Sequence, residues 1–276
     1  MIIKPSKKKL YWNIVSEKEM NKMLKIARKD YKKAVNDMPI SDYTKDYILN
    51  EKLRGKKIIK LIKGKNKVQK PMVLDIGAGF GGVSIPLARE FNVTSVDVNP
   101  YTLQFIEYRA KQENINIKTK QIEQLAFGLP FKDNSFDVIV MIGVLEWVAC
   151  GVKGNVEKIQ ENILLEVNRI LKKGGLFVFG IENRFAWDWM KGKTSHTPIK
   201  YIDLMPRKIA DIACLKKRGE KYRTYIYGKI GYKKLLDKTN FKDIQFYTAY
   251  PTYQKPKRIS KNLSPFVNSF IIFSRK

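Results

Sequence analysis

Apolar positions in the N-terminal part of the chain recur at helical intervals between many lysines. Ser16 and Glu19 have the spacing of a capping box, and apolar residues follow at the intervals of one helix face. This pattern predicts a helix over about residues 17–35 and a second, very basic helix over about 42–62. Residues 63–71 are polar and rich in turn formers, so we expect a domain boundary there.

From residue 72 onward, short apolar runs alternate with amphipathic stretches. The run at 136–141 is apolar throughout, which is typical of a strand buried on both faces of a parallel sheet. The expected strands lie near residues 72–76, 93–97, 117, 136–141, 176–181, 244–248 and 266–273, and the expected helices near 83–91, 100–112, 157–171, 206–215 and 230–239. This regular alternation predicts an α/β fold with a doubly wound sheet.

A glycine-rich turn follows the first of these strands. Gly77, Gly79 and Gly82 satisfy the dinucleotide fingerprint, and Asp97 ends the next strand at the expected distance. Glycines let the backbone turn tightly and approach a ligand, while the following helix offers free N–H groups. Two enzyme interpretations follow, one with a pyrophosphate on the loop and one with a methionine moiety across it.

Asp75, two residues before the first glycine, separates these interpretations. Its carboxylate would repel a pyrophosphate, yet it can face the cationic amino end of a methionine group directly or through water. Asp97 can accept hydrogen bonds from both hydroxyls of a ribose, which suits either cofactor. The sequence therefore favours S-adenosylmethionine over NAD.

Four motifs in order resemble the class I S-adenosylmethionine-dependent methyltransferases over about residues 73–184. They are the acidic-x-Gly-x-Gly-x-Gly motif at Asp75, Gly77, Gly79 and Gly81, the ribose carboxylate at Asp97, the Leu-Pro-Phe to Phe-Asp passage at 129–137, and the Leu-Lys-Lys-Gly-Gly helix end at 171–175. The resemblance implies a Rossmann-like, seven-stranded mixed sheet preceded by an N-terminal helical extension. The cofactor-binding residues that it implies are Asp75, Gly77, Ala78, Gly79, Gly81, Asp97, Val98, Gln121, Ile122, Glu123 and Ile142.

The chain departs from this family at two points. An Asp usually holds the adenine amine, whereas this chain offers Gln121 or Glu123 and extra residues before the Leu-Pro-Phe passage. Many quinone-pathway relatives have Leu-Glu-His after the fourth strand, and this chain has Leu-Glu-Trp at 145–147. That change removes a base or metal ligand, and we expect no metal. Residues 180–255 also resemble a methyltransferase subgroup associated with glycan and cell-surface polymer biosynthesis.

The acceptor side is expected within an insertion at about residues 182–240. His196 is the only histidine, and it is either the general base for a hydroxyl acceptor or a loop residue without a catalytic role. Arginines can grip a phosphate or carboxylate, and tryptophans can line a pocket or pack a helix. The candidate acceptor-binding residues are Trp147, Arg184, Trp187, Arg207 and Arg223.

Charge is distributed unevenly along the 276 residues, whose net charge is +28. Residues 1–70 and 191–276 carry +14 and +16, while residues 71–190 carry −2. Such basic flanks attract nucleic acid, an anionic membrane surface or a phosphorylated substrate, or reflect a lysine-rich genome.

Composition sets further limits on the class of protein. A hydrophobic content of 44% excludes global disorder, and the longest apolar run, 138–145, is too short to span a bilayer. The N-terminus shows no secretory signal, and two unpaired cysteines fit a reducing cytoplasm.

We therefore expect a basic helical extension over residues 1–70 and a methyltransferase domain over 71–276. The expected activity is methylation of a small or glycan-like, phosphate-bearing acceptor at a hydroxyl. An RNA methyltransferase, an NAD-dependent oxidoreductase and a non-catalytic partner protein that keeps the cofactor pocket are the alternatives.

Overall fold

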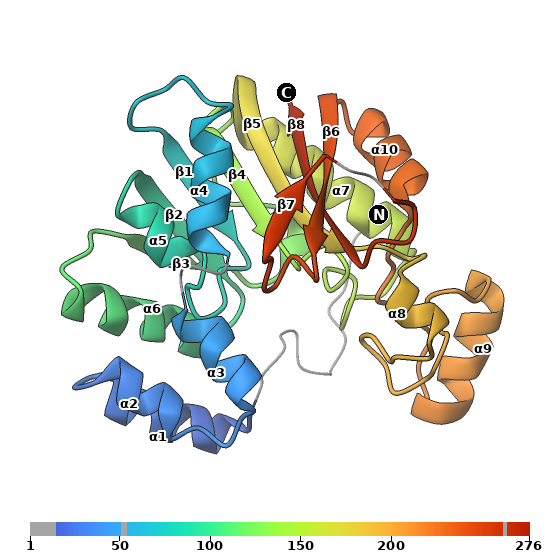
Figure 1. The fold of residues 1–276 in the computed structure, drawn as a ribbon, viewed down its shortest axis with the longest axis horizontal. Helices are drawn as coiled ribbons and strands as arrows, with labels where there is room; N and C mark the ends of the chain where they lie inside the picture. Colours follow the sequence, from blue (N-terminus) through green and yellow to red (C-terminus); the bar gives the residue numbers. More distant parts are fainter. Residues whose placement is uncertain (1–14, 51–53, 262–263) are drawn as a thin grey trace.

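A computed structural model describes residues 15–50, 54–261 and 264–276. Its helices are α1 (Glu17–Ala27), α2 (Tyr31–Asn36), α3 (Asp42–Leu49), α4 (Gly55–Lys63), α5 (Ser84–Ala88), α6 (Pro100–Gln112), α7 (Val156–Ile170), α8 (Trp187–Met190), α9 (Arg207–Arg218) and α10 (Lys229–Lys238). Its strands are β1 (Met72–Ile76), β2 (Asn92–Asp97), β3 (Lys118–Gln121), β4 (Phe136–Ile142), β5 (Leu171–Glu182), β6 (Lys242–Tyr250), β7 (Arg258–Ser260) and β8 (Ser269–Arg275). Helices cover both faces of one central sheet (Figure 1), which confirms the predicted α/β class.

The sheet has the strand order β3-β2-β1-β4-β5-β8-β6-β7. Strands β1 to β5 pair in parallel, whereas β8 pairs antiparallel with both β5 and β6. The expected count was seven strands, and the described residues form eight. The additional strand is the three-residue β7, which pairs with the end of β6 and is too short to stand out as an apolar run.

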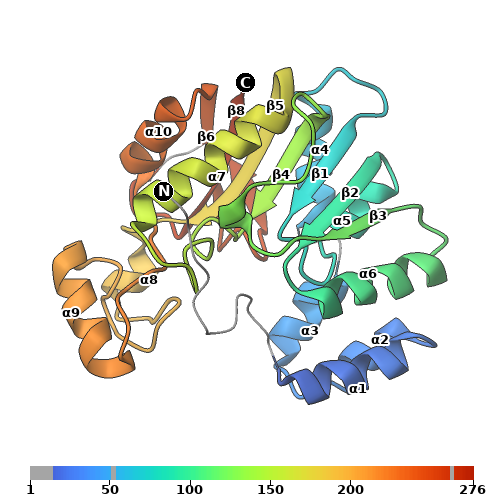
Figure 2. The same ribbon diagram turned by 180° about the vertical axis from the view of Figure 1, so that it is seen from behind.

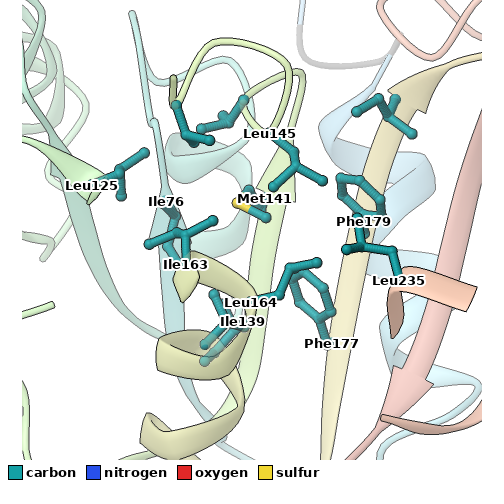
Figure 3. Packing of buried hydrophobic residues seen from close by; sticks show 14 of the residues in the cluster. Ile76, Leu125, Ile139, Met141, Leu145, Ile163, Leu164, Phe177, Phe179 and Leu235 are labelled. Atoms are coloured by element: carbon teal, nitrogen blue, oxygen red, sulfur yellow. The ribbon is translucent and has the colours of Figure 1, made fainter. Parts of the chain in front are cut away.

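Each face of the sheet has its own hydrophobic core. Helix α7 lies on one face, where Ile163 and Leu164 pack with Ile139, Met141 and other strand residues (Figure 3). Helix α4 lies on the opposite face, with its buried isoleucines in a cluster with residues of β1, β4 and α5. Figures 1 and 2 show these two layers from opposite sides.

The N-terminal helices pack onto the sheet domain instead of standing apart from it. Met20, Met23 and Ile48 form one cluster with Phe105 of α6, and the rings of Tyr31 and Phe105 meet edge to face at 6.3 Å. The described part of the extension therefore shares its core with residues beyond the expected boundary at 70.

Both long N-terminal helices of the prediction are divided in the structure. The capping box at Ser16 and Glu19 is present, but α1 ends at Ala27 and Asp30 caps a new helix by accepting from the backbone N–H of Lys32 and Lys33. The apolar spacing continues across this second helix start, and only Asp30, a residue type that favours N-caps, signals it in the sequence.

The segment after β5 forms a small lobe with a core of its own. This core joins Ile199 and Ile202 to Ala210 and Cys214 of α9 and to Tyr222. Figures 1 and 2 show that α8 and α9 lie at the same end of the sheet as α1 to α3. The two groups of helices are on opposite sides of the picture, α1 to α3 at the left and α8 and α9 at the right in Figure 1. Among the described residues, no helix is both long and apolar enough to cross a membrane.

Candidate cofactor and acceptor cavity

A cavity of about 570 Å³ lies at the carboxyl ends of β1, β2 and β4. This edge is where open α/β sheets bind their ligands. Its walls come from the glycine loop, the segment after β4, the N-terminal helices and the lobe after β5. The predicted residues that line it are Asp75, Gly77, Ala78, Gly79, Asp97, Val98, Ile122, Ile142, Trp147, His196 and Arg223.

The glycine loop owes its shape to positive φ angles. Gly77 has a φ of +70°, and a Cβ there would lie 2.4 Å from the side chain of Val144. Gly79 has a φ of +51°, and a Cβ there would meet nothing within 4 Å, so this glycine borders open space in the cavity wall. Gly81 faces inward onto Ile106 and does not line the cavity. The backbone of the loop is therefore accessible to a ligand at Gly79, whereas Gly77 packs against Val144 and Gly81 packs against Ile106.

Asp75 lies below the loop, almost fully buried, and accepts a hydrogen bond of 2.5 Å from the hydroxyl of Ser84. Burial raises the pKa of its carboxyl to about 7, against the smaller opposing effects of the Ser84 bond and the Arg54 charge. A buried carboxylate without a salt-bridge partner among the described residues is well suited to a cationic ligand group.

Asp97 ends β2 and is held by the backbone. Its two oxygens accept from the N–H groups of Gly79, at 2.8 Å, and Asn99, at 2.9 Å. Burial raises its pKa, and these backbone bonds oppose the shift. Because one of its oxygens anchors the glycine loop, the position of Asp97 is coupled to the shape of that loop.

The polar residue that faces the cavity after β3 is not one of the two expected. Gln121 and Glu123 are exposed and border a separate surface hollow, whereas Ile122 and the buried Gln124 line the main cavity. The carbonyl oxygen of the Gln124 side chain accepts from the backbone N–H of Leu125. After β3, Ile122, Gln124 and Leu125 line the cavity, so the polar residue at this wall lies further along the chain than the two expected from the sequence.

The N-terminal extension supplies part of the cavity wall, a role that was not predicted from the sequence. Tyr43 and Tyr47 of α3 line it together with Arg54. The guanidinium of Arg54 lies 4.2 Å from the ring centroid of Tyr47 and donates to its hydroxyl. The i, i+4 spacing of these two tyrosines was the available signal, because it puts both on one helix face.

The acceptor side of the cavity contains Trp147, His196 and Arg223. The rings of Trp147 and His196 meet edge to face at 4.7 Å. Arg223 donates to the carbonyls of Ala149 and Gly154, so most of its donors are already used. Further cationic side chains in the same wall, absent from the prediction, are Arg218 and Lys221.

The other three expected acceptor residues lie outside this cavity. Arg184 donates to the carbonyls of Asp203 and Met205, and Arg207 donates to Ile226 and stacks on Tyr225 at 4.1 Å. Both guanidinium groups therefore satisfy backbone carbonyls within the lobe instead of facing a ligand. Trp187 is 53% exposed and lies on α8, on the outside of the lobe.

Two glutamates flank His196 beside this cavity. Its Nε2 atom lies 3.8 Å from an oxygen of Glu146 and 3.8 Å from an oxygen of Glu182. Glu146 is fully buried, and burial together with the charge of Glu182 raises its pKa well above the usual range. Neither glutamate was a predicted site residue, because no spacing pattern in the sequence connects them to His196.

Comparison with known proteins agrees with this geometry. Residues 74–179 match the model of a family described as a methyltransferase domain. A demethylmenaquinone methyltransferase of Tropheryma whipplei is 37% identical over 108 residues, which are 38% of this chain and 39% of that protein. A ubiquinone biosynthesis O-methyltransferase of Rickettsia akari is 31% identical over 115 residues, covering 41% of this chain and 40% of the relative. The chain thus spans about two fifths of these relatives' length.

Solved structures with the same fold cover more of the chain. A SAM-dependent methyltransferase of Methanosarcina mazei has a TM-score of 0.55 at 24% identity and covers 78% of this chain and 96% of its own. A SAM-dependent methyltransferase of Thermotoga maritima has a TM-score of 0.53 at 16% identity, and the match covers 89% of this chain and 98% of that chain. The fold is that of these S-adenosylmethionine-dependent methyltransferases, and residues 74–179 match the model of a methyltransferase domain.

Proposed function

We propose that the whole chain is an S-adenosylmethionine-dependent methyltransferase. The observation that carries this proposal is the meeting of the glycine loop, Asp75 and Asp97 at one cavity that ends the parallel strands. Asp75 argues against a dinucleotide, because its carboxylate lies where a pyrophosphate would approach the loop. Bound S-adenosylmethionine supplies a methyl group on a cationic sulfur, so alignment with the acceptor is the main task left to the protein.

Each part of the cavity has a role in this alignment. In the proposed complex, Gly79 lets the backbone approach the cofactor, Asp75 pairs with its ammonium group and Asp97 accepts from its ribose hydroxyls. Ile122 and Gln124 border the adenine, and the enclosing wall with Tyr47 excludes water. His196 and Trp147 border the acceptor.

For the acceptor, we propose a small or glycan-like molecule that bears a phosphate or another anionic group and is methylated at a hydroxyl. Arg218, Lys221 and Arg223 support this choice because they line the cavity and outnumber Glu220, the one carboxylate that this segment adds to the lining. The resemblance of residues 180–255 to glycan-related methyltransferases supports it independently. Because Cys150 and Cys214 are both free thiols, the proposal includes a reducing compartment such as the cytoplasm.

Thermal unfolding tests the cofactor. S-adenosylmethionine and S-adenosylhomocysteine should raise the melting temperature by mass action, and NAD should not. Asp97→Ala should weaken this effect, since each lost charge-assisted hydrogen bond contributes about 1.5–3 kcal/mol. The control is Asp237→Ala, at an exposed carboxylate paired with Lys233 on α10. Stabilisation by NAD alone would contradict the proposal.

A methyl-transfer screen on host glycans and host RNA tests the acceptor. Labelled methyl groups should appear in the anionic glycan fraction and depend on Asp97. Incorporation into RNA only would favour the alternative that the basic flanks bind a phosphate backbone.

A further inference from the structure

Glu146, Glu182 and His196 form a cluster that the proposed methyl transfer does not explain; we call it the Glu-Glu-His cluster. Its members come from the segment after β4, the end of β5 and the loop after α8. One ligand atom from each residue can be chosen so that all three lie within 4.8 Å of one another. Three separate elements thus deliver two carboxylates and an imidazole to one point beside the cavity.

The polar atoms of this cluster lack the partners that burial normally demands. Within the described residues, neither oxygen of Glu146 accepts a hydrogen bond, and the same holds for Oε2 of Glu182 and for Nδ1 of His196. Glu146 has no exposed surface at all. Its carboxylate is therefore an unsatisfied group aimed at the other two members.

The two carboxyl groups of the cluster also lack a strongly basic partner. Among the described residues, no lysine or arginine forms an ion pair with either carboxylate, and only His196 lies within 4 Å of both. Its Nε2 atom is also 3.8 Å from each oxygen, too far for a hydrogen bond.

The surrounding residues hold the cluster in position. The hydroxyl of Tyr253 donates to Oε1 of Glu182 at 3.1 Å, and the hydroxyl of Tyr232 donates to its backbone carbonyl at 3.0 Å. Trp147 packs against the imidazole ring of His196. Hydrogen-bonded carboxylates and fixed imidazoles are typical of the groups around metal ligands.

We propose that the Glu-Glu-His cluster binds one divalent transition-metal ion through Nε2 of His196 and one oxygen each of Glu146 and Glu182. Two carboxylates and one imidazole match the ligand preferences of Mn²⁺ and Zn²⁺. Ligand atoms about 2.1 Å from a metal lie about 3–3.5 Å apart, so the observed separations need only small side-chain rotations. The ion uses acceptor atoms that the described part of the protein leaves unpaired.

This site lies beside the acceptor half of the cavity, because His196 lines that wall. Three protein ligands leave coordination positions open, as in catalytic metal sites. An oxygen of the acceptor can occupy such a position. The site revises two expectations from the sequence, that no metal binds and that His196 acts as a free general base.

Binding of Mn²⁺ alone to the full chain tests this site without any methyl transfer. After treatment with a chelator and dialysis, Mn²⁺ is titrated while the electron paramagnetic resonance signal of free Mn²⁺ is followed. We expect one site per chain, and Glu146→Gln and Glu182→Gln should each weaken it at least about tenfold, since even outer-sphere changes cost 10–100-fold. Zn²⁺ should compete, and each metal should raise the melting temperature of the wild type more than that of either cluster variant.

The matched control is Glu123→Gln, an exposed glutamate that borders a different hollow. It should bind Mn²⁺ like the wild type. Stabilisation by S-adenosylhomocysteine checks that each cluster variant is folded, and Tyr253→Phe gives a milder change that keeps all three ligands. Equal Mn²⁺ affinity in the wild type and both cluster variants would overturn the proposal, as would the absence of saturable binding by either metal. Because the readout is metal binding, it fails or succeeds independently of the methyltransferase activity.

Discussion

Substitution of Asp75 by asparagine separates the cost of burying its charge from the benefit of that charge to ligand binding. Asparagine has nearly the same shape, and its side-chain oxygen can still accept from Ser84. Asp75 is 2% exposed, and its pKa is raised from 3.8 to about 7. The variant therefore removes a buried negative charge at neutral pH with little change in packing.

The unliganded variant should be more stable than the wild type at high pH. The folded wild type holds a proton on Asp75 up to about pH 7, whereas the unfolded chain releases it near pH 4. The contribution of this group is thus fully present below pH 4 and is lost as the pH rises through 7. At about 1.4 kcal/mol per pKa unit, the upper limit of the difference at pH 8 is about 4 kcal/mol.

Ligand binding should change in the opposite direction. Loss of a charge-assisted contact to the ammonium group costs about 1.5–3 kcal/mol, so S-adenosylhomocysteine should bind about 10–150-fold more weakly to the variant at pH 7.5. At pH 5.5 the wild-type carboxyl is mostly protonated, and the two affinities should converge. Because Asp97 and Arg54 are present in both proteins, their effects cancel in this ratio.

Isothermal titration calorimetry between pH 5.5 and 7.5 measures the ratio, and urea unfolding between pH 5.5 and 8 measures the stability. Asp237→Asn, at an exposed position on α10, is the control and should change neither. A ratio near one at pH 7.5, or one that does not depend on pH, would refute the assignment of Asp75 to the ammonium group. A variant less stable than the wild type at pH 8 would refute the argument from burial.

Two further predictions concern the glycine loop and the charged surface. Gly77→Ala should lower the free energy of unfolding by about 1–3 kcal/mol, because it adds both strain at positive φ and a clash with Val144. Gly79→Ala should cost less, because it adds only the backbone strain of about 1–2 kcal/mol, and it should also weaken cofactor binding. Urea unfolding and calorimetry distinguish these effects, and equal loss of stability in both variants would contradict the geometry. If RNA is the partner, the double variant Lys216→Gln/Lys217→Gln on α9 should reduce the slope of log affinity against log salt concentration by about 1.4. Fluorescence anisotropy measures this slope, and an unchanged slope would exclude contact through α9.

Sequence reasoning worked where the determinants are local. The strand, the glycine turn and the carboxylate at position 97 lie within about one βαβ unit, so their spacing fixes their arrangement. It was less accurate past β3. Gln121 or Glu123 was expected at the cavity wall, but the polar residue found there is Gln124, one to three positions further along the chain. An arginine in the sequence likewise does not reveal its acceptor, and Arg184 and Arg207 bind backbone carbonyls of the lobe.

Groups that meet only through the tertiary fold could not be found from the sequence. Glu146, Glu182 and His196 belong to no shared spacing pattern, and only the parallel pairing of β4 with β5 puts the first two at the same edge of the sheet. The same applies to α3, whose tyrosines reach the cavity because the N-terminal helices pack on α6. The extension therefore contributes through its position, because α3 supplies Tyr43 and Tyr47 to the cavity wall. An anionic acceptor would be attracted by Arg218, Lys221 and Arg223, which line the same cavity, whereas a neutral one would gain nothing from them.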